Sequence, residues 1–227
     1  MDTRLEDMIN TIKLEAQDAA PWVGKTDIDP LVLEAMTKVP RREFVPTDVI
    51  ASAYENEPLP IGHGQTISQP YLVALMCDLL QLEPEDTILE VGTGSGYQTA
   101  VLSHLVRRVY SIELVRDLAD KARTRLDRLS YRNVEIRCGD GYHGWPEYAP
   151  FDGIVVTAAV NEIPQPLIDQ LKPGGRLIAP VGLRMQGQDL LVLEKDEVGR
   201  IQRHNVLPVA FVPLLRMGED SLVGGGG

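Results

Sequence analysis

The sequence predicts an α/β protein with a doubly wound, mostly parallel sheet, a helical addition at the N-terminus and an antiparallel hairpin at the C-terminus. Short apolar runs alternate with helical segments between residues 87 and 182, which is the pattern of βαβ units in a parallel sheet covered on both faces. Three glycines lie between the first of these strands and its helix, at Gly92, Gly94 and Gly96. The segment after residue 187 is typical of a hairpin that turns near Gly199.

Residues 1–60 are predicted to form two helices, followed by an extended segment because prolines punctuate it. We expect this part to be an addition packed on a larger domain over residues 61–217. Residues 218–227 end in four glycines and are expected to form a flexible tail. Within the larger domain the predicted strands cover residues 87–92, 108–114, 134–138, 151–160 and 175–182, and the predicted helices cover residues 95–106, 116–129 and 165–171.

Composition limits the classes of function. The 227 residues are 44% hydrophobic and 24% charged, as in ordinary soluble proteins, and the formal net charge is −11. An acidic surface disfavours a nucleic-acid partner, because phosphate binding needs a basic face. Cys77 and Cys138 fit neither a disulfide framework nor a zinc motif. The sequence also lacks a signal-peptide pattern and an apolar run that could span a bilayer. We therefore expect a cytoplasmic monomer without nucleic-acid or membrane partners.

The stretch ILEVGTGSGY carries the strongest local signal. Glycines between a strand and a helix allow a sharp turn and a close approach of the backbone to a ligand. A dinucleotide-binding loop would need a small residue where this chain has Tyr97, and a P-loop would need a lysine. A nucleophile elbow would need glycine at Thr93 and at Tyr97. The pattern E-x-G-x-G-x-G remains.

This pattern suits a nucleoside ligand without a pyrophosphate. Glu90 could bind a cationic amino group, and Glu113, at the end of the second strand, could bind the ribose hydroxyls. S-adenosylmethionine has both features, so we expect it to be the cofactor. Asp140 follows the third strand; it could accept the adenine amino group or could simply form an Asp-Gly turn. A βα turn that merely needs glycine is the alternative for the whole loop.

The methyl acceptor can be narrowed by the residues that each chemistry requires. Amino-group methyltransferases typically carry an Asp/Asn-Pro-Pro-aromatic loop where this chain has TAAV at 157–160. Neither cysteine follows a proline, as a cytosine-C5 enzyme would need, and no carboxylate cluster suggests a metal ion, so we expect none. A carboxylate needs none of these groups. With a pKa of ~3.5 an α-carboxylate is already ionised at neutral pH, and the enzyme need only position it.

The chain resembles the protein-L-isoaspartate O-methyltransferase family over about residues 5 to 215, which implies a Rossmann-like class I S-adenosylmethionine-dependent methyltransferase fold. The stretches that carry the resemblance are VPRREFVP (39–46), AYENEPLPIGHGQTISQP (53–70), ILEVGTGSGYQTA (88–100), GDGYHGW (139–145), FDGIVVTAAVNEIP (151–164) and FVPL (211–214). The glycine loop alone indicates only a methyltransferase. The combination of GQTISQP with EVGTGSGYQ is much more specific.

The resemblance implies repair of damaged proteins and peptides, by methylation of the free α-carboxylate of L-isoaspartyl residues. The ester would then collapse to a succinimide. By matching motifs, Ser68 would be the catalytic serine, Thr66 and Ile67 would cover the cofactor beside it, and Gly92, Gly94 and Gly96 would surround its methionine part. Glu113 would bind the ribose, and Asp140 with Gly141 the adenine. The FVPL segment, with Phe211, Val212 and Pro213, would lie along the substrate as a strand and offer backbone hydrogen bonds.

Several residues also have plainer interpretations. Ser68 precedes a helix and, without the resemblance, would be taken as its cap; the resemblance favours the active site. His63 is expected to have no special role, and Arg41 and Arg42 to be a solvated pair. Two other functions remain as alternatives: a nicotinamide oxidoreductase, which Tyr97 disfavours, and a nucleotide-binding module without activity.

Overall fold

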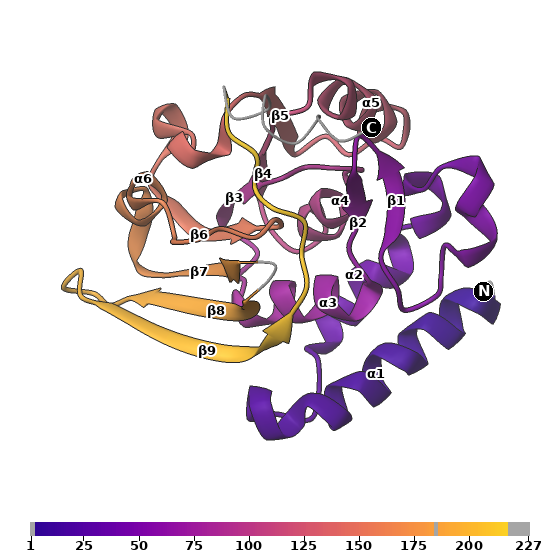
Figure 1. Ribbon diagram of the computed structural model, residues 1–227, viewed down its shortest axis with the longest axis horizontal. Coiled ribbons are helices and arrows are strands. Elements are labelled where there is room, and N and C mark those ends of the chain that lie inside the picture. Colours follow the sequence, from indigo (N-terminus) through magenta and orange to yellow (C-terminus); the bar gives the residue numbers. More distant parts are fainter. Residues whose placement is uncertain (1–2, 184–185, 218–227) are drawn as a thin grey trace.

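The computed structural model describes residues 3–183 and 186–217. A seven-stranded sheet forms its centre (Figure 1). Across the sheet the strands are, in order, β5 (Val134–Cys138), β4 (Arg108–Glu113), β3 (Thr87–Val91), β6 (Phe151–Val156), β7 (Leu171–Leu183), β8 (Gly187–Lys195) and β9 (Ile201–Val209). The first five are parallel to one another, and β8 and β9 are antiparallel additions. The predicted fold class is confirmed, and so is the turn near Gly199.

Helices cover both faces of this sheet. One face carries α1 (Thr3–Val23), α2 (Pro30–Lys38), α3 (Pro70–Leu79), α4 (Tyr97–Ser103) and α5 (Arg116–Arg128), and the other carries α6 (Gln165–Asp169) with short turns. Neighbouring residues of one strand face opposite sides, as the pleat requires. In β3, Ile88 belongs to the core under α3 and α4, whereas Leu89 belongs to the core under α6.

In the N-terminal part the two predicted helices are present as α1 and α2, but the predicted extended segment is not. The segment between Pro40 and Pro60 was expected to be extended, but its first part forms two 3-10 turns, η1 (Arg41–Phe44) and η2 (Thr47–Ser52). Pro40 and Pro46 each occupy the residue just before a turn. Proline fixes its own φ and disfavours helix only in the residue before it, so the chain can turn directly after it. The tail over 218–227 lies outside the described residues.

No helix in the described ranges is long and apolar enough to cross a membrane.

Arg41 is fully buried, so the prediction of a solvated pair is wrong for this residue. Its Nε donates to the carbonyl of Ala53 and its Nη2 to the carbonyl of Ser68, each at 2.8 Å. The guanidinium also lies over the ring of Tyr97, 4.7 Å from its centroid. Burial lowers the pKa of Arg41 to about 10, so the group is still charged at neutral pH. Arg41 therefore ties the N-terminal part to the loop before α3 and to α4.

Replacing Arg41 tests this tie. We expect Arg41→Lys to lower the free energy of unfolding by about 2 kcal/mol, because one ammonium cannot reproduce the planar group that bonds two carbonyls and stacks on a ring. Urea unfolding followed by circular dichroism measures the change. The exposed neighbour supplies the control: Arg42→Lys should change the same free energy by less than about 0.5 kcal/mol. Equal effects of the two substitutions would contradict the tie.

Candidate active site

The site lies where the strand order reverses between β3 and β6, at the carboxyl ends of the parallel strands. Ligands of open α/β sheets bind at such a point. Above it sits a hairpin of β1 (Leu59–Gly62) and β2 (Gln65–Ile67). Two small cavities, of about 30 and 40 Å³, lie there and share Gly92. The first is lined by Thr66, Ile67, Ser68, Val73, Glu90, Gly92, Thr93, Gly94, Ser95, Tyr97, Gln98 and Thr157.

The three glycines of the loop after β3 all have positive φ angles, of 102°, 52° and 85°, which residues with side chains rarely adopt. Gly92 has a further restriction, because a Cβ there would collide with the Oγ1 of Thr157. That hydroxyl donates to the carbonyl of Gly92 at 2.6 Å. Gly96 is the N-cap of α4. The loop therefore needs glycine for its own geometry.

Glu90 is fully buried in the wall of the first cavity. The strand alternation that turns Ile88 toward α4 turns Glu90 the same way. Its Oε2 accepts hydrogen bonds from Thr99 at 2.5 Å and from Ser111 at 2.6 Å. Its Oε1 has no partner among the described residues. Burial raises the pKa of Glu90 to about 7, against the lowering effect of the two hydroxyls.

Glu113 lies in the second cavity with Gln65 and Gly141. Its Oε2 accepts from the N–H of Gly94 at 2.8 Å and its Oε1 from the N–H of Val115 at 2.9 Å. Burial raises the pKa of this carboxyl, and these backbone donors oppose the rise. The carboxylate at the end of β4 thus fixes the middle glycine of the loop.

Asp140 forms the Asp-Gly turn, which was one of the two interpretations of this residue from the sequence. Its Oδ1 accepts from the N–H of Tyr142 at 2.9 Å and caps η3 (Gly141–His143). Its Oδ2 accepts from the N–H of Met217 at 3.3 Å. Contact with an adenine remains a prediction, since Gly141 but not Asp140 borders the second cavity.

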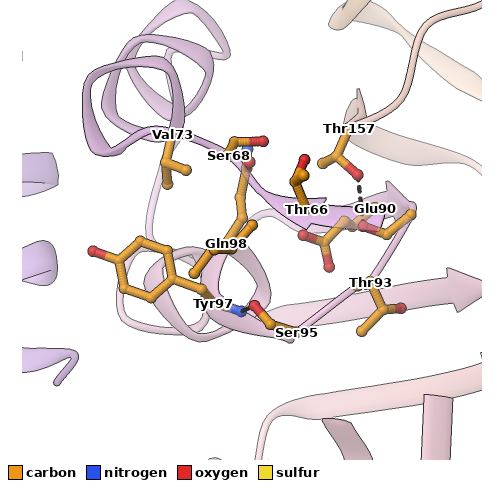
Figure 2. Close-up of a pocket in the computed structure, with 12 residues that line it drawn as sticks. Thr66, Ser68, Val73, Glu90, Thr93, Ser95, Tyr97, Gln98 and Thr157 are labelled. Atoms are coloured by element: carbon orange, nitrogen blue, oxygen red, sulfur yellow. Dashed lines mark hydrogen bonds between the residues drawn. The ribbon is translucent and has the colours of Figure 1, made fainter. Parts of the chain in front are cut away.

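Ser68 is half-buried and does not cap α3. The N-cap is Gln69, and no side chain caps this helix end. The Ser68 carbonyl accepts the bond from Arg41, while the Ser68 hydroxyl has no partner among the described residues. Figure 2 shows Ser68, Thr66, Glu90 and Thr157 around one cavity. The hydroxyl is therefore available to a ligand.

His63 has a partner that the sequence did not indicate. Its Nε2 lies 2.7 Å from the Oδ2 of Asp117 in the first turn of α5, and both side chains are about half exposed. His63 itself has a φ of 55°, between two glycines with positive φ. The contact fastens the tip of the β1–β2 hairpin over the loop after β3.

The segment 211–214 is not a strand. Only Pro213 forms an isolated bridge, with Ala159. The side chain of Gln188, which is buried, bonds both backbone groups of Phe211: Phe211 N donates to its Oε1 at 2.6 Å, and its Nε2 donates to the Phe211 carbonyl at 3.2 Å. The Phe211 N–H is thus occupied within the protein. Pro213 borders the cavity that holds Glu113.

The structure brings most of the predicted site residues to these two cavities. Outside both lie Gly96, Asp140, Phe211 and Val212. Sequence reasoning did not assign Gln98 and Thr157 to the site, although both line the first cavity. It also did not identify Arg41 and Gln188 as the residues that bond the backbone of Ser68 and of Phe211. Within the described residues, no group of three or more His, Cys, Asp or Glu side chains could hold a metal ion.

Comparisons with known proteins agree with this geometry. The family model described as Protein-L-isoaspartate(D-aspartate) O-methyltransferase matches residues 25–219. Protein-L-isoaspartate O-methyltransferase 2 of Syntrophobacter fumaroxidans is 60% identical over 91% of this chain and 84% of its own length. Its namesake from Polaromonas sp. is 55% identical over 91% of this chain and 98% of its own length.

Two solved structures are similar over 92% of this chain. One is a protein-L-isoaspartate O-methyltransferase that is 30% identical, with a TM-score of 0.77 over 65% of its chain. The other is a Plasmodium falciparum protein assigned to the same activity and solved with S-adenosyl-L-homocysteine, 25% identical with a TM-score of 0.76 over 97% of its chain. The resemblance in the sequence is confirmed: the chain belongs to the protein-L-isoaspartate(D-aspartate) O-methyltransferase family, enzymes that methylate isoaspartyl residues with S-adenosylmethionine.

Proposed function

We propose that the crevice between the β1–β2 hairpin and the loop after β3 is where this methyltransferase brings S-adenosylmethionine and an isoaspartyl carboxylate together. One observation carries the proposal: Glu90, whose buried Oε1 has no hydrogen-bond partner among the described residues, lines the same cavity as Ser68. A buried carboxylate oxygen without a hydrogen-bond partner lowers the stability of the protein unless a ligand supplies that partner. The ammonium group of S-adenosylmethionine is a ligand of the required charge.

The cofactor residues have separate roles in this proposal. Glu90 binds the ammonium group, and the glycine loop, under Thr66 and Ile67, lies along the methionine part. Glu113 binds the ribose hydroxyls in the second cavity, and the adenine contacts Gly141, which borders that cavity, and its neighbour Asp140. When bound there, S-adenosylmethionine supplies the methyl group, which passes to the acceptor without any proton transfer. The chain therefore needs no general base at this site.

Ser68 orients the acceptor. Its hydroxyl can donate to a substrate carboxylate, and the bond from Arg41 to its carbonyl fixes the position of its backbone. Charge-assisted hydrogen bonds of this kind are short and directional. Phe211, Val212 and Pro213 are proposed to border the substrate on the outer side of the crevice. Because Gln188 holds the N–H of Phe211, this residue offers the substrate no free N–H.

The wider setting is also a proposal. We propose that the enzyme works as a cytoplasmic monomer on isoaspartyl proteins and peptides and not on nucleic acids, with residues 1–60 as an addition to a methyltransferase domain over 61–217. The net charge of −11 supports the exclusion of nucleic acids. The ties that Arg41 makes to Ala53 and Ser68 support the close packing of the N-terminal part.

Substrate identity is tested with two peptides of one sequence, one with an isoaspartyl and one with an aspartyl residue. With methyl-labelled S-adenosylmethionine we expect base-labile methyl ester on the isoaspartyl peptide only, because only there does a free α-carboxylate stand at the reacting position. Scintillation counting of base-released methanol gives the rates. Equal labelling of the two peptides, or labelling of neither, would overturn the assignment.

Ser68→Ala tests the orienting hydroxyl. We expect kcat to fall about ten- to hundredfold, as for loss of a hydrogen bond to a charged group, while the Kd of S-adenosylmethionine changes little. Steady-state kinetics and calorimetry separate the two effects. Ser103→Ala is the matched control, since its hydroxyl bonds only the Ala100 carbonyl within α4, and it should leave both values unchanged. A collapse of cofactor binding in Ser68→Ala would refute the orienting role.

The raised pKa of Glu90 predicts a pH dependence of cofactor binding. An ammonium group needs the ionised carboxylate, and with a pKa of about 7 that form is the minor one at pH 6. The affinity for S-adenosylmethionine should therefore rise roughly five- to tenfold between pH 6 and pH 7.5 and level off above. Calorimetry at several pH values measures this. Glu90→Gln should bind more weakly and lose the rise; a variant that keeps the full rise would show that another group is responsible.

A further inference from the structure

A groove of about 660 Å³ lies beside the crevice, between the second half of α1, the start of α3 and the end of β9. It is far larger than the two cavities of the crevice and has the size of a ligand-binding site. Figure 1 shows α1, α3 and the end of β9 on this side of the molecule. The walls include Asp18, Trp22, Gln69, Leu72, Leu207 and Ala210.

Two wall residues of the groove are direct sequence neighbours of residues proposed for the acceptor site. Gln69, in its wall, directly follows Ser68, and Ala210, in the opposite wall, directly precedes Phe211. The strand β9 that leads into it is the outermost strand of the sheet. An edge strand keeps backbone N–H and C=O groups that can bond an extended peptide. A polypeptide whose isoaspartyl residue reaches Ser68 can therefore continue along this groove.

The chemistry of the walls is acidic and apolar. Glu15 and Asp18 lie one helical turn apart on α1, both border the groove, and neither pairs with a cation among the described residues. Trp22, one turn further on, is 63% exposed, and a large exposed aromatic side chain in a groove is typical of a binding surface.

Besides the two carboxylates, the wall contains a buried hydroxyl without a hydrogen-bond partner among the described residues. It is the hydroxyl of Tyr71. Burial foremost, with the charges of Glu15 and Asp78, raises the pKa of Tyr71 to about 12. Tyr71 is therefore neutral, and the negative charge of this wall comes from Glu15 and Asp18. Lysine and arginine suit such walls, because their stems are apolar and their heads cationic.

We propose that this groove binds the substrate polypeptide next to the isoaspartyl residue, and that Glu15 and Asp18 select sites with a lysine or arginine a few residues away. The inference rests on the proposed place of the acceptor at Ser68. Trp22 and the apolar wall bind the side-chain stems, and the two carboxylates bind the cationic head. Isoaspartyl sites with acidic neighbours are disfavoured by repulsion from the same carboxylates.

The test uses isoaspartyl peptides of one length that carry lysine, glutamine or glutamate three residues before or three residues after the isoaspartate. For wild type we expect kcat/KM to be about fivefold higher for lysine than for glutamate on one of the two sides, as for exposed ion pairs in a shared site. The ratio should shrink in 0.5 M salt through screening. The double substitution Glu15→Gln with Asp18→Asn should bring the ratio close to one.

Controls separate this inference from the function itself. Glu6→Gln, on an exposed part of α1 away from the groove, should keep the full lysine preference. Trp22→Ala should raise KM for all the peptides and leave the Kd of S-adenosylmethionine unchanged. Methylation without any charge preference, or a preference that survives the double substitution, would overturn the proposed role of the groove and leave the proposed function standing. Methylation of no peptide would overturn the proposed function and this inference with it. A dimer that Trp22→Ala dissociates would assign the groove to a second copy of the chain and overturn the inference.

Discussion

A carboxylate buried under the centre of the sheet is the constraint on which the rest of the site depends. Glu90 comes from β3, the middle one of the five parallel strands, is fully buried, and has only one of its two oxygens hydrogen-bonded among the described residues. The hydroxyls of Thr99 in α4 and Ser111 in β4 donate to that oxygen. In the proposed function the other oxygen receives the ammonium group of the cofactor, since a buried charge without a partner is strongly unfavourable. Cofactor binding would thus complete the hydrogen bonding of Glu90.

The segments that cover the site, the N-terminal turns and the β1–β2 hairpin, precede the sheet in the chain. Arg41 bonds the carbonyls of Ala53 and Ser68 and so connects the N-terminal turns to the loop before α3. The hairpin tip is fastened by His63 and Asp117, which are exposed, and exposed ion pairs contribute little stability. The hairpin and the Arg41 tie thus meet at the two cavities, which Thr66, Ile67 and Ser68 border on one side and Gln65 on the other.

The sequence predicted the sheet well because local patterns decide it. The strand Val134–Cys138 has the predicted bounds, and the glycine loop carries its own conformational signal. What could not be predicted depends on pairs far apart in the chain. The burial of Arg41 needs the ring of Tyr97 and a carbonyl from each of two loops, the partner of His63 is 54 residues away, and Gln188 holds a segment 23 residues later. Such contacts leave no local periodicity in the sequence. The proline rule that suggested an extended segment between Pro40 and Pro60 does not predict the turns that follow Pro40 and Pro46.

The packing of Gly92 against Thr157 bears on how such sequences should be compared. Any side chain at residue 92 would collide with the Thr157 hydroxyl, so the fold itself preserves this glycine. A descendant that had stopped using the cofactor would still retain it. Glu90 differs, because its proposed role is to bind the ammonium group of the cofactor, and a buried, half-satisfied carboxylate is unfavourable without such a partner; in a descendant that no longer bound the cofactor, we expect an apolar residue or an amide there. Among relatives of this chain, the residue at position 90 is therefore the better mark of a working enzyme.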